Sequence, residues 1–142
     1  MSETAVIFYS YTGHTRALAQ KKARKLHADL IELKDAKPRS KVNAFVAGSF
    51  ASLRNQKAAL AQPVPDLSGY QKIVLLCPIW AGHLAPPANN VIDALPPRKD
   101  VQVFAVSMSG DSSSSRQKTI ARLKEKGCAS VQYQDVRSST IQ

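Results

Sequence analysis

The stretch that decides the fold of this chain is Thr4–Thr15, which reads Thr-Ala-Val-Ile-Phe-Tyr-Ser-Tyr-Thr-Gly-His-Thr. Its first half, Thr4–Tyr9, is short and almost continuously apolar, which is typical of a strand buried on both faces of a parallel sheet. Its second half, Ser10–Thr15, is a polar loop, and His14–Ala28 is rich in the helix formers Ala, Leu, Lys, Arg and Gln. A buried strand, a tight loop and a helix in this order predict the opening unit of an α/β fold.

The same alternation continues along the chain. Further strands are predicted at Asp29–Leu33, Lys72–Cys77, Val101–Ser107 and Ala129–Tyr133. Further helices are predicted at Val42–Ala61, Pro86–Leu95 and Ser112–Lys126, the last one closed by Gly127. Five strands alternating with four helices predict a doubly wound α/β fold, with a five-stranded parallel sheet and helices on both faces. Ligands of such sheets bind beyond the carboxyl ends of the strands, so function is expected in the loops after the first, third and fourth strands.

Length and composition predict one domain over residues 1–142, because 44% hydrophobic residues suffice for one buried core. No apolar run approaches the roughly 18 residues that a membrane span needs, and the first strand begins too early to leave room for a signal peptide. We therefore expect a soluble cytoplasmic protein. Cys77 and Cys128 have no metal-binding or redox spacing and are expected to be buried free thiols.

Twenty Lys and Arg against ten Asp and Glu give a formal net charge of +10. The basic residues flank a nearly neutral middle of the chain, Val42–Pro97. Such a balance raises nucleic acid, a membrane surface or an acidic partner as possible targets. Nucleic-acid binding would favour aromatic residues among the basic ones, and the run Lys21–Lys25 has none, so a solvated helix face explains it better.

The loop Ser10–Thr15 has the properties of an anion site. It precedes a predicted helix, whose first backbone N–H groups and dipole favour an anion, and it carries three hydroxyl side chains. Gly13 allows a close approach of the backbone, so phosphate is the natural ligand. The same hydroxyls would also serve as ordinary helix and turn caps, and the pattern alone leaves both interpretations open.

The segment after the third predicted strand contains Trp80, the only tryptophan of the chain, between Pro78 and Gly82. A large aromatic side chain in a loop needs a packing partner, and a flat ring system is a good candidate. Ordinary core packing at the end of the sheet would explain the residue as well.

The two motifs together resemble the flavodoxin family, whose phosphate loop has the form Ser/Thr-x-Thr-Gly-x-Thr. Ser10, Thr12, Gly13 and Thr15 match it, and His14 stands where asparagine is usual. Ile73–His83 is similar to bacterial flavodoxin-like proteins with a Pro-Ile/Val-Trp-x-Gly flavin loop. The resemblance implies flavin mononucleotide (FMN) as cofactor and an electron-transfer role. For such a role, the net positive charge makes an acidic redox protein the expected partner, and no membrane is expected.

The resemblance also implies site residues in three loops. The second flavin-ring loop would be Ser107–Asp111, which lacks the aromatic residue common in the family, so the second ring face would rest on Met108 or backbone. The expected cofactor-binding residues are Ser10, Tyr11, Thr12, Gly13, His14, Thr15, Pro78, Ile79, Trp80, Ala81, Gly82, His83, Ser107, Met108, Ser109 and Gly110. No catalytic residue and no metal ligand are expected among them.

Other functions of the same architecture fit the sequence less well. A low-molecular-weight phosphatase needs a cysteine where Ser10 stands, and a response-regulator receiver needs an aspartate where the chain has Cys77-Pro78. A P-loop nucleotidase needs a Gly-Lys-Ser/Thr triplet, which is missing. Two alternatives stay open: an NAD(P)H-dependent quinone or FMN reductase built on the same site, and a flavin-free binding module.

Overall fold

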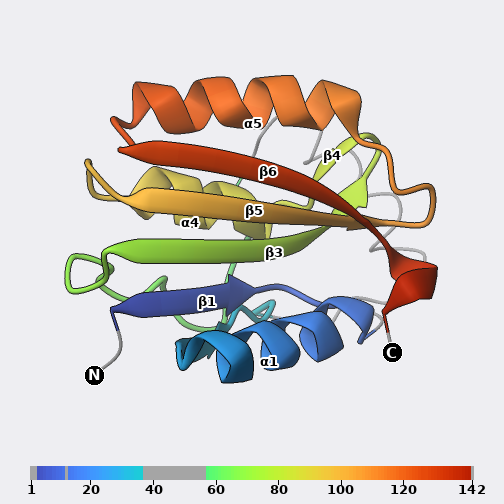
Figure 1. Cartoon of the computed structure of the whole chain (residues 1–142), viewed down its shortest axis with the longest axis horizontal. Coiled ribbons are helices and arrows are strands. Elements are labelled where there is room, and N and C mark those ends of the chain that lie inside the picture. The colour runs from blue at the N-terminus through green and yellow to red at the C-terminus, as the bar shows by residue number, and fades with distance from the viewer. Residues whose placement is uncertain (1–2, 12, 37–56, 142) are drawn as a thin grey trace.

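The computed structural model describes residues 3–11, 13–36 and 57–141. Within them, five strands form a parallel sheet in the order β2-β1-β3-β5-β6, and a sixth short strand, β4, pairs with β3 (Figure 1). The strands are β1 (Thr4–Phe8), β2 (Asp29–Glu32), β3 (Lys72–Trp80), β4 (His83–Leu84), β5 (Asp100–Ser107) and β6 (Ser130–Arg137). The helices are α1 (His14–Leu26), α4 (Pro87–Ala94) and α5 (Ser113–Glu125), followed by a 3-10 turn, η2 (Ser138–Thr140). The predicted doubly wound α/β fold is confirmed, with one more strand than predicted.

The two sheet faces are packed by different helices. On one face, Ile7 and Leu75 pack with Val91 of α4 and Leu123 of α5 in the larger buried cluster. On the other face, α1 packs onto Val6, Val74 and Phe104 in a smaller cluster. Strands β1 and β3 are buried from both sides, which explains why their sequences are continuously apolar.

Strand β6 lies at the edge of the sheet and continues to Arg137, four residues beyond the predicted end at Tyr133. It stays paired with β5 along its whole length, up to Ser107 opposite Arg137. Gln132 and Gln134 are exposed, whereas Tyr133 between them is buried against the α4 and α5 side. This alternation is expected of a strand with one covered face, and the polar residues of the other face made the strand look shorter.

The sequence places Trp80 in a loop, and this prediction is wrong: β3 runs through Pro78 to Trp80 and turns back as a hairpin into β4. The turn residues Ala81 and Gly82 have φ of 52° and 79°, the two positive values that a tight two-residue hairpin turn requires. Pro78 is tolerated in β3 because β1 has already ended at Phe8, opposite Leu76, so one side of the strand no longer needs an N–H there.

The helix predicted over Val42–Ala61 lies mostly outside the described residues, and its described end, residues 57–61, is not helical. Leu60 forms an antiparallel bridge with Asp35, and the Ala61 amide donates to the Lys34 carbonyl at 2.8 Å. The Asn90 side chain of α4 binds both backbone groups of Ala58, at 2.8 and 3.0 Å. The backbone groups of residues 58 and 61 thus bond to other segments of the chain, and these bonds replace the i→i−4 hydrogen bonds that a helix would need.

The other helix limits are close to those predicted, and Gly127 follows α5 with φ of 80°, as expected of a residue that ends a helix. Both cysteines are free, but only Cys77 is buried, while Cys128 is partly exposed. In the described parts of the chain, no helix combines the length and the apolar character that a membrane crossing requires.

Candidate functional site

A cavity of about 510 Å³ opens at the carboxyl ends of β1, β3 and β5. This is the edge of the sheet where the sequence predicts a ligand, because parallel strands direct their following loops to the same side. Four segments far apart in the sequence meet there, the loop after β1, the end of β3, the end of β5 with its following loop and the turn that follows β6. The cavity is lined by Tyr11, His14, Thr15, Pro78, Ile79, Trp80, Val106, Ser107, Met108 and Ser138.

The loop between β1 and α1 supplies the polar end of the cavity. The Gly13 amide donates to Ser10 Oγ at 3.0 Å, which closes the loop upon itself, so Ser10 shapes the loop and does not line the cavity. Thr15, in the first turn of α1, is only 3% exposed and faces the cavity, and His14 beside it is exposed. Thr12 lies outside the described residues.

Gly13 is the N-terminal cap of α1 and has φ of 100°, a conformation that side chains other than glycine rarely adopt. A Cβ atom built on Gly13 would meet no other atom within 4 Å, so the space over this backbone is open. Below it, the first N–H groups of a helix have no partner within the helix and carry its positive partial charge. An anion can therefore approach the loop backbone closely.

Trp80 and Tyr11 form the aromatic wall of the cavity, and Tyr9 packs against Trp80 without lining the cavity. The Trp80 ring meets Tyr9 edge-on, with ring centroids 5.8 Å apart, and Tyr11 edge-on at 6.2 Å. Tyr9 is buried, whereas Tyr11 is 36% exposed at the rim. Edge-to-face contacts of this kind fix the orientation of aromatic rings, so Trp80 stands in a defined position on the cavity wall.

The opposite wall is the loop after β5. Ser107 Oγ accepts from the Gly110 amide at 3.0 Å, and an Arg137 guanidinium nitrogen donates to the Ser109 carbonyl at 3.1 Å. Gly110 has φ of 74°, and a Cβ there would lie 3.3 Å from the Arg137 Cβ, which makes glycine the residue that fits. Met108 stands out of this loop with 89% of its surface exposed. Ser109 and Gly110 shape the loop but do not line the cavity.

A buried polar network ties the end of this loop to β6. Ser112 is a donor to Asp135 Oδ1, and its hydroxyl oxygen lies 2.7 Å from the Tyr133 hydroxyl. Tyr133 in turn donates to Ser115 at 3.0 Å, and burial raises its pKa. Ser112 precedes the first residue of α5, but its side chain makes no capping bond because it is engaged in this network.

His83 and the hairpin turn lie behind the cavity wall. Ala81 and Gly82 form the turn, and His83 is paired with Trp80 in the hairpin, so none of the three lines the cavity. Burial lowers the pKa of His83, and the nearby positive charge of Lys118 acts in the same direction. Both effects favour the neutral imidazole of His83.

Two features of the cavity were missed in the sequence. Ser138 lines the wall because β6 continues to Arg137, beyond its predicted end. Tyr11 was expected only as a phosphate-loop residue, yet its ring packs on Trp80 and supplies an aromatic side chain next to the loop that lacks one. The greater length of β6 is indicated in the sequence by the alternation of Gln132, Tyr133 and Gln134. The contact of Tyr11 with Trp80 depends on the conformation of the loop backbone and leaves no sequence pattern.

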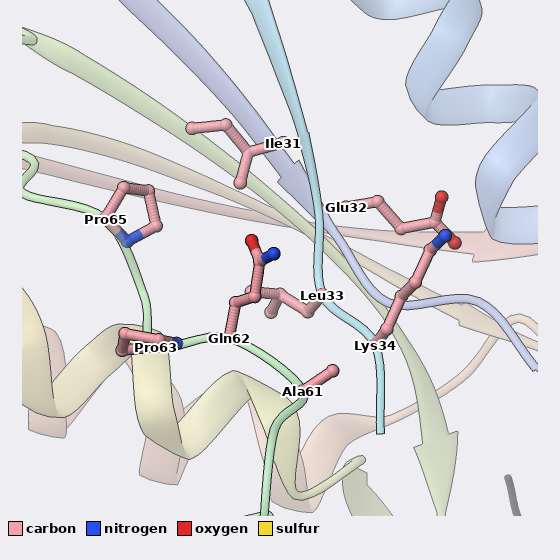
Figure 2. Close-up of a pocket in the computed structure, with 8 residues that line it drawn as sticks. All are labelled: Ile31, Glu32, Leu33, Lys34, Ala61, Gln62, Pro63 and Pro65. Carbon is pink, nitrogen blue, oxygen red and sulfur yellow. The ribbon is translucent and has the colours of Figure 1, made fainter. Parts of the chain in front are cut away.

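A second hollow, of about 310 Å³, lies beside the edge strand β2 and outside the predicted site (Figure 2). Ile31 and Leu33 face Gln62, Pro63 and Pro65 across it, whereas the side chains of Glu32 and Lys34 extend to the other side of β2 (Figure 2). Glu32 is ion-paired with Arg16 of α1. The described residues that line this hollow include neither a helix N-terminus nor an aromatic side chain.

No protein-family model matches the chain, and no curated protein matches it. Several solved structures match the chain. A provisionally named flavoprotein from Bacteroides uniformis has a TM-score of 0.78 and 22% identity, covering 93% of this chain and 89% of its own. A flavoprotein from Lactobacillus acidophilus, crystallised in complex with FMN, has a TM-score of 0.74 and 17% identity, with 94% of both chains covered.

A flavodoxin, WrbA-like protein from Agrobacterium tumefaciens matches with a TM-score of 0.59 and 18% identity, over 90% of this chain and 75% of its own. Sequence identities this low establish the fold and not the ligand. The chain thus has a flavodoxin-like α/β fold, and its ligand has to be argued from the site.

Proposed function

We propose that this chain is an electron-transfer flavoprotein that binds FMN in the cavity at the carboxyl ends of β1, β3 and β5. The observation that carries the proposal is the meeting of the start of helix α1 and an aromatic wall in one cavity, which is lined by Tyr11, His14, Thr15, residues 78–80 and residues 106–108. A ligand with a phosphate at one end and a flat ring system at the other fits both ends. The FMN complex of the Lactobacillus acidophilus protein, which has the same fold, supports this choice.

The donor set fits the phosphate of FMN. Thr15, in the first turn of α1, lines the cavity, and the backbone at the preceding Gly13 is open, so the N–H groups of this helix start and a hydroxyl side chain would be available to the phosphate. Ser10 would keep the loop closed around the phosphate through its bond to the Gly13 amide. No basic side chain is needed in the loop, because backbone amides and hydroxyls bind phosphate well at a helix start.

The other end fits the isoalloxazine ring. Trp80 and Tyr11 offer aromatic surface, and Pro78, Ile79 and Val106 offer apolar surface. When bound, FMN supplies redox chemistry that no side chain of this protein has, since it accepts and releases electrons singly or in pairs. The protein's own residues would orient the ring and set how much of it water reaches.

An acidic redox protein is the proposed partner. The chain carries a net charge of +10, and Arg137 lies beside the loop that presents the exposed Met108. Positive charge around an exposed apolar rim favours docking of a negatively charged partner and accelerates the encounter.

The test is the absorption spectrum and activity of the purified protein after incubation with FMN and removal of free ligand. An electron carrier retains the flavin and does not oxidise NADPH at a catalytic rate without a separate reductase. Sustained NADPH oxidation by the protein alone would favour the alternative of an NAD(P)H-dependent quinone or FMN reductase. A colourless protein would favour the flavin-free binding module.

A further inference from the structure

The aromatic wall of the cavity continues into the protein interior. Trp80 contacts Tyr9 with ring centroids 5.8 Å apart, and Tyr9 is only 2% exposed. Beyond Tyr9 stands a carboxylate: the Tyr9 hydroxyl donates to Asp35 Oδ2 at 2.5 Å. Asp35 follows β2, and it is held in place by the bridge that pairs it with Leu60. An indole at the cavity, a buried phenol and a fixed carboxylate therefore form a continuous row.

This order of groups has a specific chemical property. Indole and phenol are the side chains that lose an electron most readily, but a phenol gives up an electron easily only if its proton leaves at the same time. A carboxylate already accepting that proton's hydrogen bond is the base that such a transfer needs. Tyr9 and Asp35 have this arrangement before any reaction starts.

We propose that Trp80, Tyr9 and Asp35 form a relay that removes an oxidising equivalent from the cavity wall. A one-electron oxidant in or near the cavity takes an electron from Trp80 and leaves an indole radical cation. Tyr9 then passes an electron to the indole, while its phenolic proton moves from Oη to Asp35 Oδ2. The products are neutral Trp80, a neutral tyrosyl radical and a protonated Asp35, so electrons, protons and charge balance.

Electrostatics favours the forward direction. Before the transfer, a cation stands on Trp80 and an anion on Asp35, on either side of the buried Tyr9. After it, all three groups are neutral. Separated charges next to a low-dielectric interior are costly, so their mutual removal stabilises the product state.

Tyr11 also touches Trp80, with ring centroids 6.2 Å apart, and is the alternative electron donor. It is 36% exposed, whereas Tyr9 is buried with a carboxylate already in hydrogen-bond contact. The proposal therefore assigns the transfer to Tyr9. The relay uses only residues of the chain, so it holds or fails independently of FMN binding.

Pulse radiolysis of the full chain without added flavin tests the relay. Azide radicals oxidise tryptophan, and the chain contains one tryptophan, so the indole radical seen in the experiment is that of Trp80. In the unmodified protein, this radical should decay in step with the appearance of a tyrosyl radical, at a rate independent of protein concentration. Tyr9→Phe and Asp35→Asn should each slow the decay at least about tenfold.

Tyr70→Phe is the matched control, because the Tyr70 hydroxyl also donates to an aspartate, Asp29, at 2.7 Å. Tyr70 lies just before β3 and Trp80 ends that strand, so the two are separated by the whole length of β3, about 26 Å. Tyr70→Phe and Tyr11→Phe should leave the decay unchanged. Decay as fast as in the unmodified protein in either Tyr9→Phe or Asp35→Asn, with the fold verified by circular dichroism, would overturn the relay. A slower decay of the indole radical in Tyr11→Phe would overturn the relay as well. If Tyr9→Phe does not fold, Asp35→Asn alone provides the test.

Discussion

Replacing Thr15 by valine should weaken the binding of FMN but not that of riboflavin. Thr15 is 3% exposed, stands in the first turn of α1 and lines the cavity. Valine keeps the branched shape and a similar helix propensity, so the change removes one hydroxyl and little else. A hydrogen bond to a charged phosphate contributes about 1.5 to 3 kcal/mol, which corresponds to a loss of roughly 10- to 150-fold in FMN affinity.

Riboflavin makes this experiment specific, because it has the same ring system and lacks the phosphate. FMN and riboflavin are each titrated by calorimetry into the unmodified protein and into Thr15→Val. Any loss of affinity that is common to the two ligands then cancels in the comparison. Thr119→Val is the matched control, since Thr119 is equally buried but belongs to α5 and does not line the cavity. An equal loss for FMN and riboflavin, or no loss for FMN, would refute the assignment of the phosphate to this helix end.

Four further predictions follow from the packing, the charges and the aromatic wall. Leu123→Ala in the core should lower the free energy of unfolding, measured in urea, by about 2 to 5 kcal/mol. Leu26→Ala, at a residue that is 37% exposed, should lower it far less. Similar losses of stability in the two variants would contradict the described core. Burial raises the pKa of the Cys77 thiol to about 12, so alkylation at pH 8 should label Cys128 first and Cys77 only on unfolding. Equal labelling rates for the two cysteines would show that Cys77 is accessible in the folded protein. FMN should quench the fluorescence of Trp80, and an unaltered signal at saturation would place the ring elsewhere. The association rate with an acidic redox partner should fall as salt rises, because a net charge of +10 is screened, and a salt-independent rate would exclude steering.

The sequence was sufficient for the sheet and for the sheet edge at which the cavity opens, because both depend on local patterns. Buried parallel strands such as β1 and β3 are apolar throughout, and the rule for ligand position in parallel sheets then selects the loops after β1, β3 and β5. Strand β6 was predicted too short because the open sheet face allows glutamines at alternate positions, which resemble a loop.

The details around Trp80 depend on tertiary contacts that a single sequence does not encode locally. Pro78 normally argues against a central strand, but here the neighbouring strand β1 has already ended, so β3 continues to Trp80. The positive φ of Ala81 is unusual for a residue with a side chain, and no local pattern predicts it. The edge-on contact of Tyr11 with Trp80 likewise arises only when the loop after β1 meets the end of β3.

The most direct test of the central claim is a map of the backbone amide resonances of the labelled protein during titration with FMN. Binding as proposed should shift the amides of the cavity segments, at residues 11–15, 79–80, 106–108 and 138, and leave the edge of β2 unchanged. Shifts confined to the hollow between Ile31 and Pro65, or no saturable shifts at all, would contradict the claim that this cavity holds FMN.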